Sequence, residues 1–474
     1  MIDSTKQTAT KAGLPLGKQR NYNEVVDYLD SHWSVNANSK TLERMKKLDA
    51  ALGSLASKLP TIFVSGTNGK SLTVHFTTKL LMQEGLKVGA LCHPHILTYN
   101  ERISLNSEAV SNKIFTEIAN EVINTSENLG LQTNSNEILA MMAIMYFSQQ
   151  KVDAAVLEVN EGGTYNPVNI CDAKVVAITR ATEDDVITPT EKMKDIITDI
   201  AGVIKKGTHL VSGDQVKEHL QLMNDLTDAQ GGLWAMPIRK LAPLAYPFEQ
   251  LHGRCAALAE RLAQIFVDKF LNKNSVIVNN SLLARQKGQR GRPTLEAKQK
   301  LAENPQKTLE QFWKHNTNEL PGRFQLLDKE KPSILLDTAS NVDAFKNLLL
   351  GTRLLHYQRP LKGLTIIVAA AQDKLACEEF YKLIRYFFKK TSGQLLVCPI
   401  EEPLSGNKEE VSWDIEKVTN EMKALKVKAK ACKTFEEAFD LAKKSVDERQ
   451  GLVVITGSQS IVSKYWQNKG IKKF

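Results

Sequence analysis

The sequence lacks the features that mark several classes of protein. Its six cysteines are scattered and no two stand at C-x-x-C spacing, so neither a disulfide framework nor a zinc site is indicated. No apolar run approaches the ~18 residues of a membrane span, and the first residues contain no apolar stretch typical of a signal peptide. The sequence therefore predicts a cytoplasmic protein with reduced thiols and no membrane contact.

A strong excess of one charge is also missing. The 474 residues include 62 Lys and Arg against 53 Asp and Glu, a net charge of +9. This modest excess fits acidic small molecules such as nucleotides as well as it fits nucleic acid. The 42% of hydrophobic residues exclude a disordered chain, and the length is typical of two or three domains.

Strand and helix patterns alternate along most of the chain. Residues 61–65 form a β-rich apolar run, after which apolar residues recur at helical spacing. We expect further buried strands at residues 88–91, 154–159, 174–179, 209–212, 333–337, 364–370, 394–399 and 452–457. Between residues 213 and 273 we expect helical or irregular structure. The alternation predicts an α/β fold with a parallel sheet and a second, smaller α/β domain after a turn at Pro321.

The motif GTNGKS, residues 66–71, lies between the first strand and the first of these helices. Backbone N–H groups and a helix N-terminus form an anion site there, because Gly66 and Gly69 let the backbone approach closely. Lys70 supplies a positive charge and Ser71 can bind Mg²⁺. A full phosphate-loop motif would need glycine at Val64, so the loop is a shortened variant. It predicts a nucleoside triphosphate site, with an ordinary turn as the alternative.

Glu158 stands in the otherwise apolar run AAVLEV. It lies near the carboxyl end of a predicted strand, where ligands bind in open α/β sheets. A carboxylate in such surroundings needs a partner, and Mg²⁺ is the natural one, with a backbone cap as the alternative.

The motif GTNGKS resembles the ATP loop of the Mur ligase superfamily, and its flanking sequence resembles the folylpolyglutamate synthase/dihydrofolate synthase family. Further segments similar to that family follow in the same order: PHILTYNERI (94–103), AVLEVNEGGTYNPVNI (155–170), LPGRFQ (320–325), DTASN (337–341), AAQDK (370–374) and TGSQSIV (456–462).

The resemblance implies an architecture and a reaction. A parallel-sheet P-loop ATPase domain, residues 1–318, would be followed by a smaller doubly wound α/β domain, residues 319–474. With ATP and Mg²⁺ as cofactors, the carboxylate of a folate or dihydropteroate would attack the γ-phosphate of ATP to give an acyl phosphate. The amino group of L-glutamate would then displace phosphate.

The resemblance also implies roles for single residues. The residues expected to act in catalysis are Lys70, Glu158, Arg323 and Asp337. Those expected to bind the nucleotide are Gly66, Thr67, Asn68, Gly69, Lys70, Ser71, Arg323 and Asn341. Those expected to hold metal are Ser71, Glu158 and Asp185. We further expect a monomer whose partners are small molecules rather than nucleic acid or a membrane.

Several positions depart from the family pattern. His93 replaces a serine expected to contact Mg²⁺, and Asp185 replaces a metal-binding histidine. Ile200 stands where the family has a lysine that helps hold a second metal, and Ser340 replaces a histidine. Because isoleucine cannot coordinate a cation, the second metal site is in doubt. Asn136 replaces an aromatic residue near the pterin end of the acceptor, and no other aromatic is found in that region.

Two other functions stay open from the sequence. One is a ligase for a different acceptor, and the other is an inactive ligase-like chain that acts as a nucleotide-binding scaffold or binds nucleic acid. The basic run RQKGQRGRP, residues 285–293, could contact nucleic acid as an arm, although it contains no aromatic side chain for stacking. A solvated insertion is the simpler interpretation.

Overall fold

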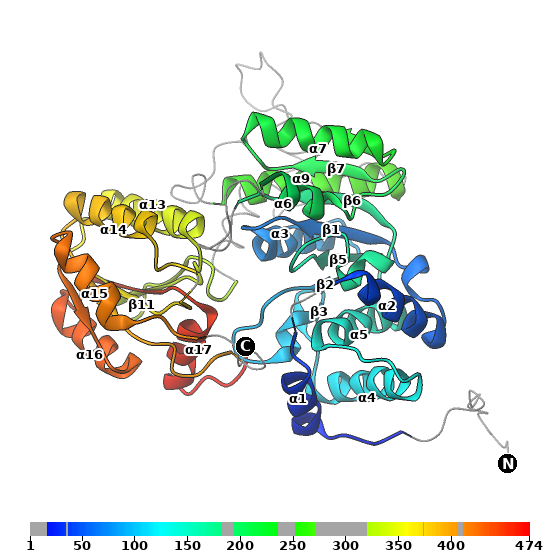
Figure 1. Cartoon of the computed structure of the whole chain (residues 1–474), viewed down its shortest axis with the longest axis horizontal. Coiled ribbons are helices and arrows are strands. Elements are labelled where there is room, and N and C mark those ends of the chain that lie inside the picture. The colour runs from blue at the N-terminus through cyan, green and yellow to red at the C-terminus, as the bar shows by residue number, and fades with distance from the viewer. Residues whose placement is uncertain are drawn as a thin grey trace, which may run out of the picture.

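The computed structural model describes residues 17–34, 37–182, 193–235, 252–271, 320–372, 374–404 and 411–474. These residues form two sheets, each with its own helices, that lie side by side in Figure 1. The predicted α/β fold is confirmed. The expected domain boundary at residues 318–319 and the basic run 285–293 lie outside the described residues.

The larger sheet has the strand order β4-β3-β2-β5-β1-β6-β7-β8. Its strands are β1 (Thr61–Ser65), β2 (Val88–Leu91), β3 (Ile103–Leu105), β4 (Glu108–Ala109), β5 (Ala154–Glu158), β6 (Ala173–Ile178), β7 (His209–Ser212) and β8 (Leu233–Ala235). The strands from β2 to β8 in this order pair in parallel, as predicted, whereas β3 and β4 form an antiparallel edge. Asn106 and Ser107 both have positive φ, which is the backbone of a tight two-residue hairpin.

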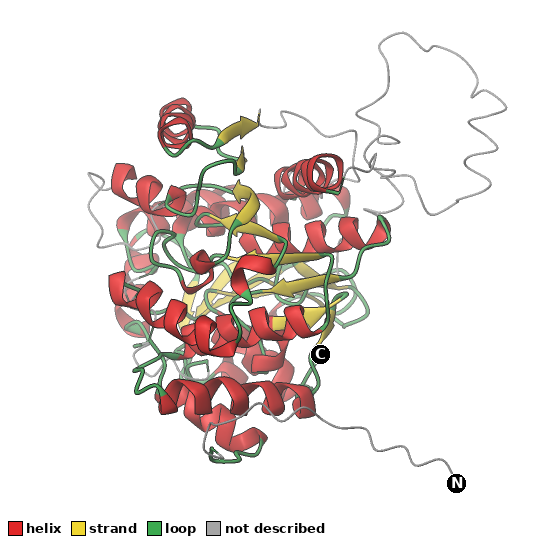
Figure 2. Cartoon of the chain, turned by 90° about the vertical axis from the view of Figure 1, so that its right-hand side faces the viewer, coloured by secondary structure: helices red, strands yellow, loops and turns green. Residues whose placement is uncertain are grey.

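Helices cover both faces of the larger sheet because side chains alternate along each strand. On β1, Phe63 packs toward one face, while Ile62 and Val64 pack toward the other. The first face is covered by α1 (Tyr22–Ser31), α2 (Ser39–Leu52), α4 (Asn112–Asn128), α5 (Ser135–Gln149), α6 (Met193–Ala201) and α7 (Lys217–Ala229). The second face is covered by α3 (Lys70–Gln83) and α9 (Gly253–Ile265), with the short turn Phe266–Phe270. Figure 2 shows the strands enclosed between these helices.

Short 3-10 helices join some of these elements: Ala56–Lys58, Tyr99–Arg102 and Pro167–Ile170. No helix among the described residues is both long enough and apolar enough to cross a membrane.

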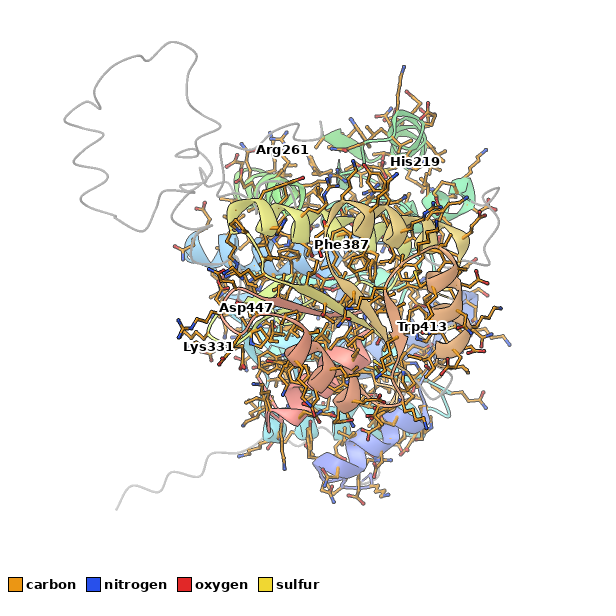
Figure 3. The ribbon with its side chains drawn as sticks, turned by 90° about the vertical axis from the view of Figure 1, so that its left-hand side faces the viewer. His219, Arg261, Lys331, Phe387, Trp413 and Asp447 are labelled. Atoms are coloured by element: carbon orange, nitrogen blue, oxygen red, sulfur yellow. The ribbon has the colours of Figure 1, made fainter. Side chains whose placement is uncertain are left out.

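The smaller sheet has the order β13-β12-β11-β14-β10-β9, and β9 pairs antiparallel at its edge. Its strands are β9 (Gln325–Leu327), β10 (Ser333–Leu336), β11 (Leu364–Val368), β12 (Gln394–Val397), β13 (Ala429–Ala431) and β14 (Leu452–Thr456). One face packs on α13 (Val342–Gln358), α14 (Glu378–Lys390) and α15 (Ile415–Ala424), and the other packs on α16 (Phe435–Ser445) and α17 (Gln459–Asn468). Phe387 and Trp413, labelled in Figure 3, belong to the first of these apolar clusters.

The predicted strands are all present, and their ends differ from the predictions by at most two residues. The expectation for residues 213–273 was incomplete, because β8 lies within them and extends the sheet beyond β7. Only three residues long and at the sheet edge, β8 gives a weak sequence pattern.

Candidate active site

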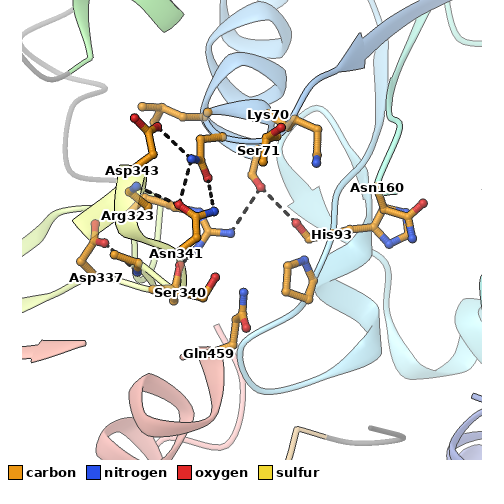
Figure 4. Close-up of a pocket in the computed structure, with 18 of the residues that line it drawn as sticks. Lys70, Ser71, His93, Asn160, Arg323, Asp337, Ser340, Asn341, Asp343 and Gln459 are labelled. Carbon is orange, nitrogen blue, oxygen red and sulfur yellow. Dashed lines mark hydrogen bonds between the residues drawn. The ribbon is translucent and has the colours of Figure 1, made fainter. Parts of the chain in front are cut away.

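A cleft with a volume of about 1180 Å³ lies between the two sheets. The phosphate loop follows β1, Glu158 ends β5, and Asp337 follows β10, so both sheets contribute the carboxyl ends of parallel strands to it. Open α/β sheets bind their ligands at this end. Figure 4 shows Lys70 and Ser71 on one side of the cleft and Arg323, Asp337 and Asn341 on the other.

The phosphate loop has the backbone that its two glycines allow. Gly66 has φ of 119° and Gly69 has φ of 89°, a region that other residues rarely adopt. A Cβ atom on Gly66 would lie only 2.3 Å from Oγ1 of Thr179, so this position also needs glycine for space. Lys70 opens α3 and donates to the carbonyl of Gly66 at 2.7 Å, which places its ammonium over the loop.

Ser71 and Glu158 meet at the base of the cleft. The Ser71 hydroxyl lies 3.0 Å from the carbonyl of His93 and 3.3 Å from Oε1 of Glu158. Glu158 is only 2% exposed, and its other oxygen accepts from the His93 amide at 3.1 Å. Burial raises the pKa of Glu158, while Lys70, the His93 amide and Arg323 oppose that rise. The pair offers two hard oxygen ligands to a cation.

Arg323 connects the smaller sheet to the phosphate loop. Its Nη2 lies 3.3 Å from the Ser71 hydroxyl, and its Nη1 donates to Thr338. Asp337 holds the same segment, because its carboxylate accepts from the amides of Phe324 at 2.8 Å and Ala339 at 2.9 Å. Desolvation raises the pKa of Asp337 to about 6. In this structure, Asp337 thus joins the backbone that follows Arg323 to the segment that follows β10.

The side chain of Asn68 also crosses the cleft. It forms a reciprocal amide pair with Asn341, with distances of 3.1 and 3.0 Å, and it donates to Asp343 at 3.0 Å. Asn341 in addition caps the N-terminus of α13. Thr67 is tied to its own domain, since its hydroxyl donates to the carbonyl of Thr182 at 2.9 Å.

The structure adds residues that sequence reasoning missed. Arg180, directly after β6 and Thr179, forms an ion pair of 3.0 Å with Asp343 across the cleft. Arg102 lines the cleft as well and is 1% exposed. Position after a predicted strand was the available signal for Arg180, and the similarity of the PHILTYNERI segment to the family was the available signal for Arg102.

The positions that depart from the family pattern have different surroundings in the structure. Ile200 is 5% exposed and belongs to the apolar cluster beneath α6, so its side chain is core. Its backbone carbonyl accepts from the Ser65 hydroxyl at 3.2 Å, which places this part of α6 beside the end of β1. The His93 ring lies 3.3 Å from Nη1 of Arg102, and Ser340 lines the cleft. Asp185 lies outside the described residues.

Among the described residues, Ser71 and Glu158 offer oxygen donors for one Mg²⁺. They supply a hydroxyl and a buried carboxylate, and burial raises the pKa of that carboxylate. No cluster of three or more His, Cys, Asp or Glu side chains that could hold a metal is found in the part of the chain that the structure describes. A Mg²⁺ shared with the phosphates of a nucleotide typically needs only one or two protein ligands.

Comparisons with known proteins find relatives of this chain. The chain is 28% identical to a dihydrofolate synthase/folylpolyglutamate synthase of Bacillus subtilis over 318 residues, which cover 65% of this chain and 70% of that protein. No protein-family model matches the chain.

Solved structures share the fold. The folylpolyglutamate synthase of Mycobacterium tuberculosis, complexed with ADP, superposes with a TM-score of 0.73 at 19% identity, covering 95% of this chain and 98% of that one. A bifunctional folylpolyglutamate synthase/dihydrofolate synthase of Yersinia pestis with Mn, AMPPNP and L-glutamate bound gives 0.69 at 21% identity, covering 96% and 100%.

Proposed function

We propose that the chain is a divergent member of the folylpolyglutamate synthase/dihydrofolate synthase family and acts as an ATP-dependent ligase that adds L-glutamate to a folate. One observation in this structure supports the proposed function: the Ser71 hydroxyl of the phosphate loop contacts both Glu158 and Arg323. A loop that served only as a turn would not gather a buried carboxylate and an arginine from the second sheet.

In this proposal the phosphate loop and the start of α3 bind the triphosphate of ATP. Backbone amides after Gly66 and the positive end of the α3 dipole face the phosphates. Lys70 and Arg323 neutralise the charge that develops as the γ-phosphoryl group is transferred to the acceptor carboxylate. L-glutamate then attacks the acyl phosphate, and phosphate leaves.

Ser71 and Glu158 would hold one Mg²⁺, which when bound neutralises phosphate charge. The contacts of Glu158 with Ser71 and with the His93 amide fix its carboxylate at the base of the loop. Burial raises the pKa of Glu158, and Lys70 and Arg323 oppose that rise; a bound cation would favour the ionised carboxylate in the same way. Asp185 stays a predicted ligand, and with Ile200 in the core we propose that one Mg²⁺ suffices.

The two sheets would act as two domains, with residues 1–318 and 319–474 as the proposed division. Arg323 and Asp337 come from the smaller sheet, whereas the phosphate loop comes from the larger one. The ATP site between the sheets would therefore be complete only when the two sheets lie against each other. We propose a cytoplasmic monomer, and its six free cysteines support a reducing compartment.

Release of ADP from MgATP by the purified chain tests the proposal. We expect release only when an acceptor, dihydropteroate or tetrahydrofolate, and L-glutamate are both present, with a product that has gained one glutamyl residue by mass spectrometry. ADP release without either substrate, or none with any acceptor although ATP binds, would show that the chain is a nucleotide-binding scaffold instead.

A further inference from the structure

A short segment after β6 lies directly against the phosphate loop. Residues 179–182, which we call the Arg180 segment, form three hydrogen bonds with Thr67. The Thr67 amide donates to the carbonyl of Arg180 at 2.7 Å, and its hydroxyl donates to the carbonyl of Thr182 at 2.9 Å. The Thr182 amide donates back to that hydroxyl at 3.1 Å. The shape of the loop at Thr67 therefore depends on where this segment lies.

The Arg180 segment has little free space around it. A Cβ atom on Gly66 would lie 2.9 Å from the carbonyl oxygen of Arg180, and one on Gly213, directly after β7, would lie 2.7 Å from that of Thr179. β6 and β7 are neighbours in the larger sheet (Figure 1). The segment is thus packed between the phosphate loop on one side and the end of β7 on the other.

Asp214 binds the Arg180 segment from the β7 side. It lies two residues after β7 and is 5% exposed. Its Oδ2 accepts from the Ala181 amide at 2.9 Å and lies 3.3 Å from Nδ1 of His219, which Figure 3 labels. Its Oδ1 accepts from the amides of Gln215 and Val216 at 2.7 and 2.8 Å. The carboxylate therefore joins the start of α7 to the segment.

One peptide group connects Asp214 to the phosphate loop. The peptide bond between Arg180 and Ala181 is trans, so its N–H and its C=O point in opposite directions. The N–H donates to Asp214, and the C=O accepts from the Thr67 amide. The carboxylate thus fixes the plane of this peptide and directs its carbonyl toward the loop. A charged acceptor also polarises the peptide, which strengthens the hydrogen bond on its other side.

The cap of a turn accounts for only half of these contacts. Aspartate commonly accepts from backbone amides just ahead of it, and Oδ1 does so here. Oδ2 instead reaches Ala181, 33 residues away in the sequence. Burial acts to raise the pKa of Asp214, but hydrogen bonds from Ala181, Val216 and His219 outweigh it and hold that pKa below its usual range. The carboxylate is therefore ionised where it meets the segment.

We propose that Asp214 is a positioning residue for ATP binding, because through the Arg180–Ala181 peptide it fixes Thr67 and the phosphate-binding shape of the loop. The inference rests on the proposed function, since that function places the phosphates of ATP at this loop. Asp214 acts on the loop rather than on the acceptor or L-glutamate. Its loss should therefore affect ATP and leave the two other substrates alone.

Asp214→Asn tests the inference with a side chain of the same shape. When the asparagine oxygen accepts from Gln215 and Val216, its NH2 group faces the Ala181 amide, and two donors cannot bond. We expect the affinity of the full chain for a non-hydrolysable ATP analogue with Mg²⁺, measured by calorimetry, to fall about tenfold or more. The KM for ATP should rise, while those for the acceptor and L-glutamate stay constant. Hydrogen exchange at Thr67, followed by mass spectrometry without nucleotide, should become faster.

His219→Ala is the matched control. It removes the other donor to Oδ2 and leaves the Ala181 contact in place, so ATP affinity and exchange at Thr67 should stay as in the wild type. Thr67→Val gives a second test, since it removes the hydroxyl contacts with Thr182. If both residues act through the Arg180 segment, the double variant Asp214→Asn/Thr67→Val should lose less ATP affinity than the product of the two single effects.

The outcomes separate the inference from the proposed function. Turnover by the wild-type chain, with unchanged ATP affinity in Asp214→Asn, overturns the inference and leaves the ligase intact. Faster exchange at Thr67 and weaker ATP binding in Asp214→Asn, without glutamate addition by the wild-type chain, support the inference and overturn the ligase. A wild-type chain that does not bind the ATP analogue overturns both. Equal losses in Asp214→Asn and His219→Ala, or an Asp214→Asn chain that does not fold, would show a general structural role and overturn the inference.

Discussion

The family that the sequence resembles has cation ligands at two regions, and these regions are built differently in this chain. At the phosphate loop, Ser71 and the buried carboxylate of Glu158 face Lys70 and Arg323, so charges and oxygen ligands are matched. At the α6 side, Ile200 packs into the apolar core and leaves only its backbone carbonyl near β1. The difference shows that the side chains predicted to bind phosphate come together at the loop. The side chain at position 200, in contrast, offers no ligand for a second cation.

The largest expected effect concerns Lys70 on the phosphate side. We expect Lys70→Ala to lower the rate of ADP release by about 10³-fold, because an ammonium over the phosphates stabilises the charge of the transferring group. The assay is substrate-dependent ADP release. Lys113→Ala, on the exposed start of α4, is the control and should keep full activity. Residual activity within tenfold of wild type would contradict the role of the loop.

Glu158→Gln should separate activity from stability. The change keeps the shape but removes the buried charge, so we expect activity to fall by about 10²-fold and the Mg²⁺ concentration needed for half-maximal rate to rise. Because burial disfavours the ionised carboxyl, thermal stability without nucleotide should be equal or higher. A Mg²⁺ titration and a melting curve measure both. A Glu158→Gln variant that is less stable but fully active would contradict the role of Glu158 as a Mg²⁺ ligand.

The pH dependence tests the role of Asp337. Its pKa of about 6 predicts that activity falls as pH drops below about 6, since the protonated carboxyl accepts more weakly from the amide of Phe324, the residue next to Arg323. The free energy of unfolding should change in the opposite direction. The pKa of Asp337 is about 6 in the folded chain and has an ordinary value of 3.8, so the protonated carboxyl stabilises the fold at low pH. This contribution is lost as pH rises through about 6. Asp337→Asn should remove the activity change near pH 6. A pH–rate profile identical to that of wild type would exclude Asp337 as its source.

Ile200→Val tests whether the side chain of Ile200 serves only the apolar core. We expect a loss of about 0.5–1.5 kcal/mol in the free energy of unfolding, as for one buried methyl group, with unchanged kcat and Mg²⁺ dependence. Urea unfolding followed by circular dichroism measures the first quantity. A change in Mg²⁺ dependence without a change in stability would place this residue in the cation site after all.

The smallest expected effect concerns the contact between the two sheets. Arg180 and Asp343 form a partly exposed ion pair, which typically contributes about 0.2–1 kcal/mol. A double-mutant cycle with Arg180→Ala and Asp343→Ala, read out as ATP affinity, should give a coupling within that range that weakens in high salt. Strictly additive effects of the two substitutions would show that the pair does not join the sheets in solution.

Local sequence patterns were sufficient for much of the fold. The strand–loop–helix order around residues 61–83 follows from a β-rich run, two glycines and helical spacing, and all three are short-range properties. The edge strands were harder to predict. β8 is three residues long and exposed on one side, so no strong alternation marks it.

Long-range neighbours required the tertiary structure. Arg180 and Asp343 are far apart in the sequence, and only the approach of the two sheets joins them. The same holds for the aromatic residue that seemed to be missing beside Asn136. No aromatic near position 136 in the sequence lines the cleft, whereas Trp33, in the loop after α1, does line it, and Asn136 donates to the carbonyl of the neighbouring Ser34.

The sequence by itself predicted the chemistry that short motifs encode, because Gly66, Gly69, Lys70 and Ser71 stand in the order and spacing typical of an anion-binding loop. It also determined that Ile200 cannot bind metal, since no packing gives a hydrocarbon side chain a donor atom. Only the tertiary structure decided which residues complete the cleft. Arg323 reaches Ser71, and Asn136 reaches Ser34, through the packing of separate elements, whose relative positions depend on buried surface contributed by the whole chain.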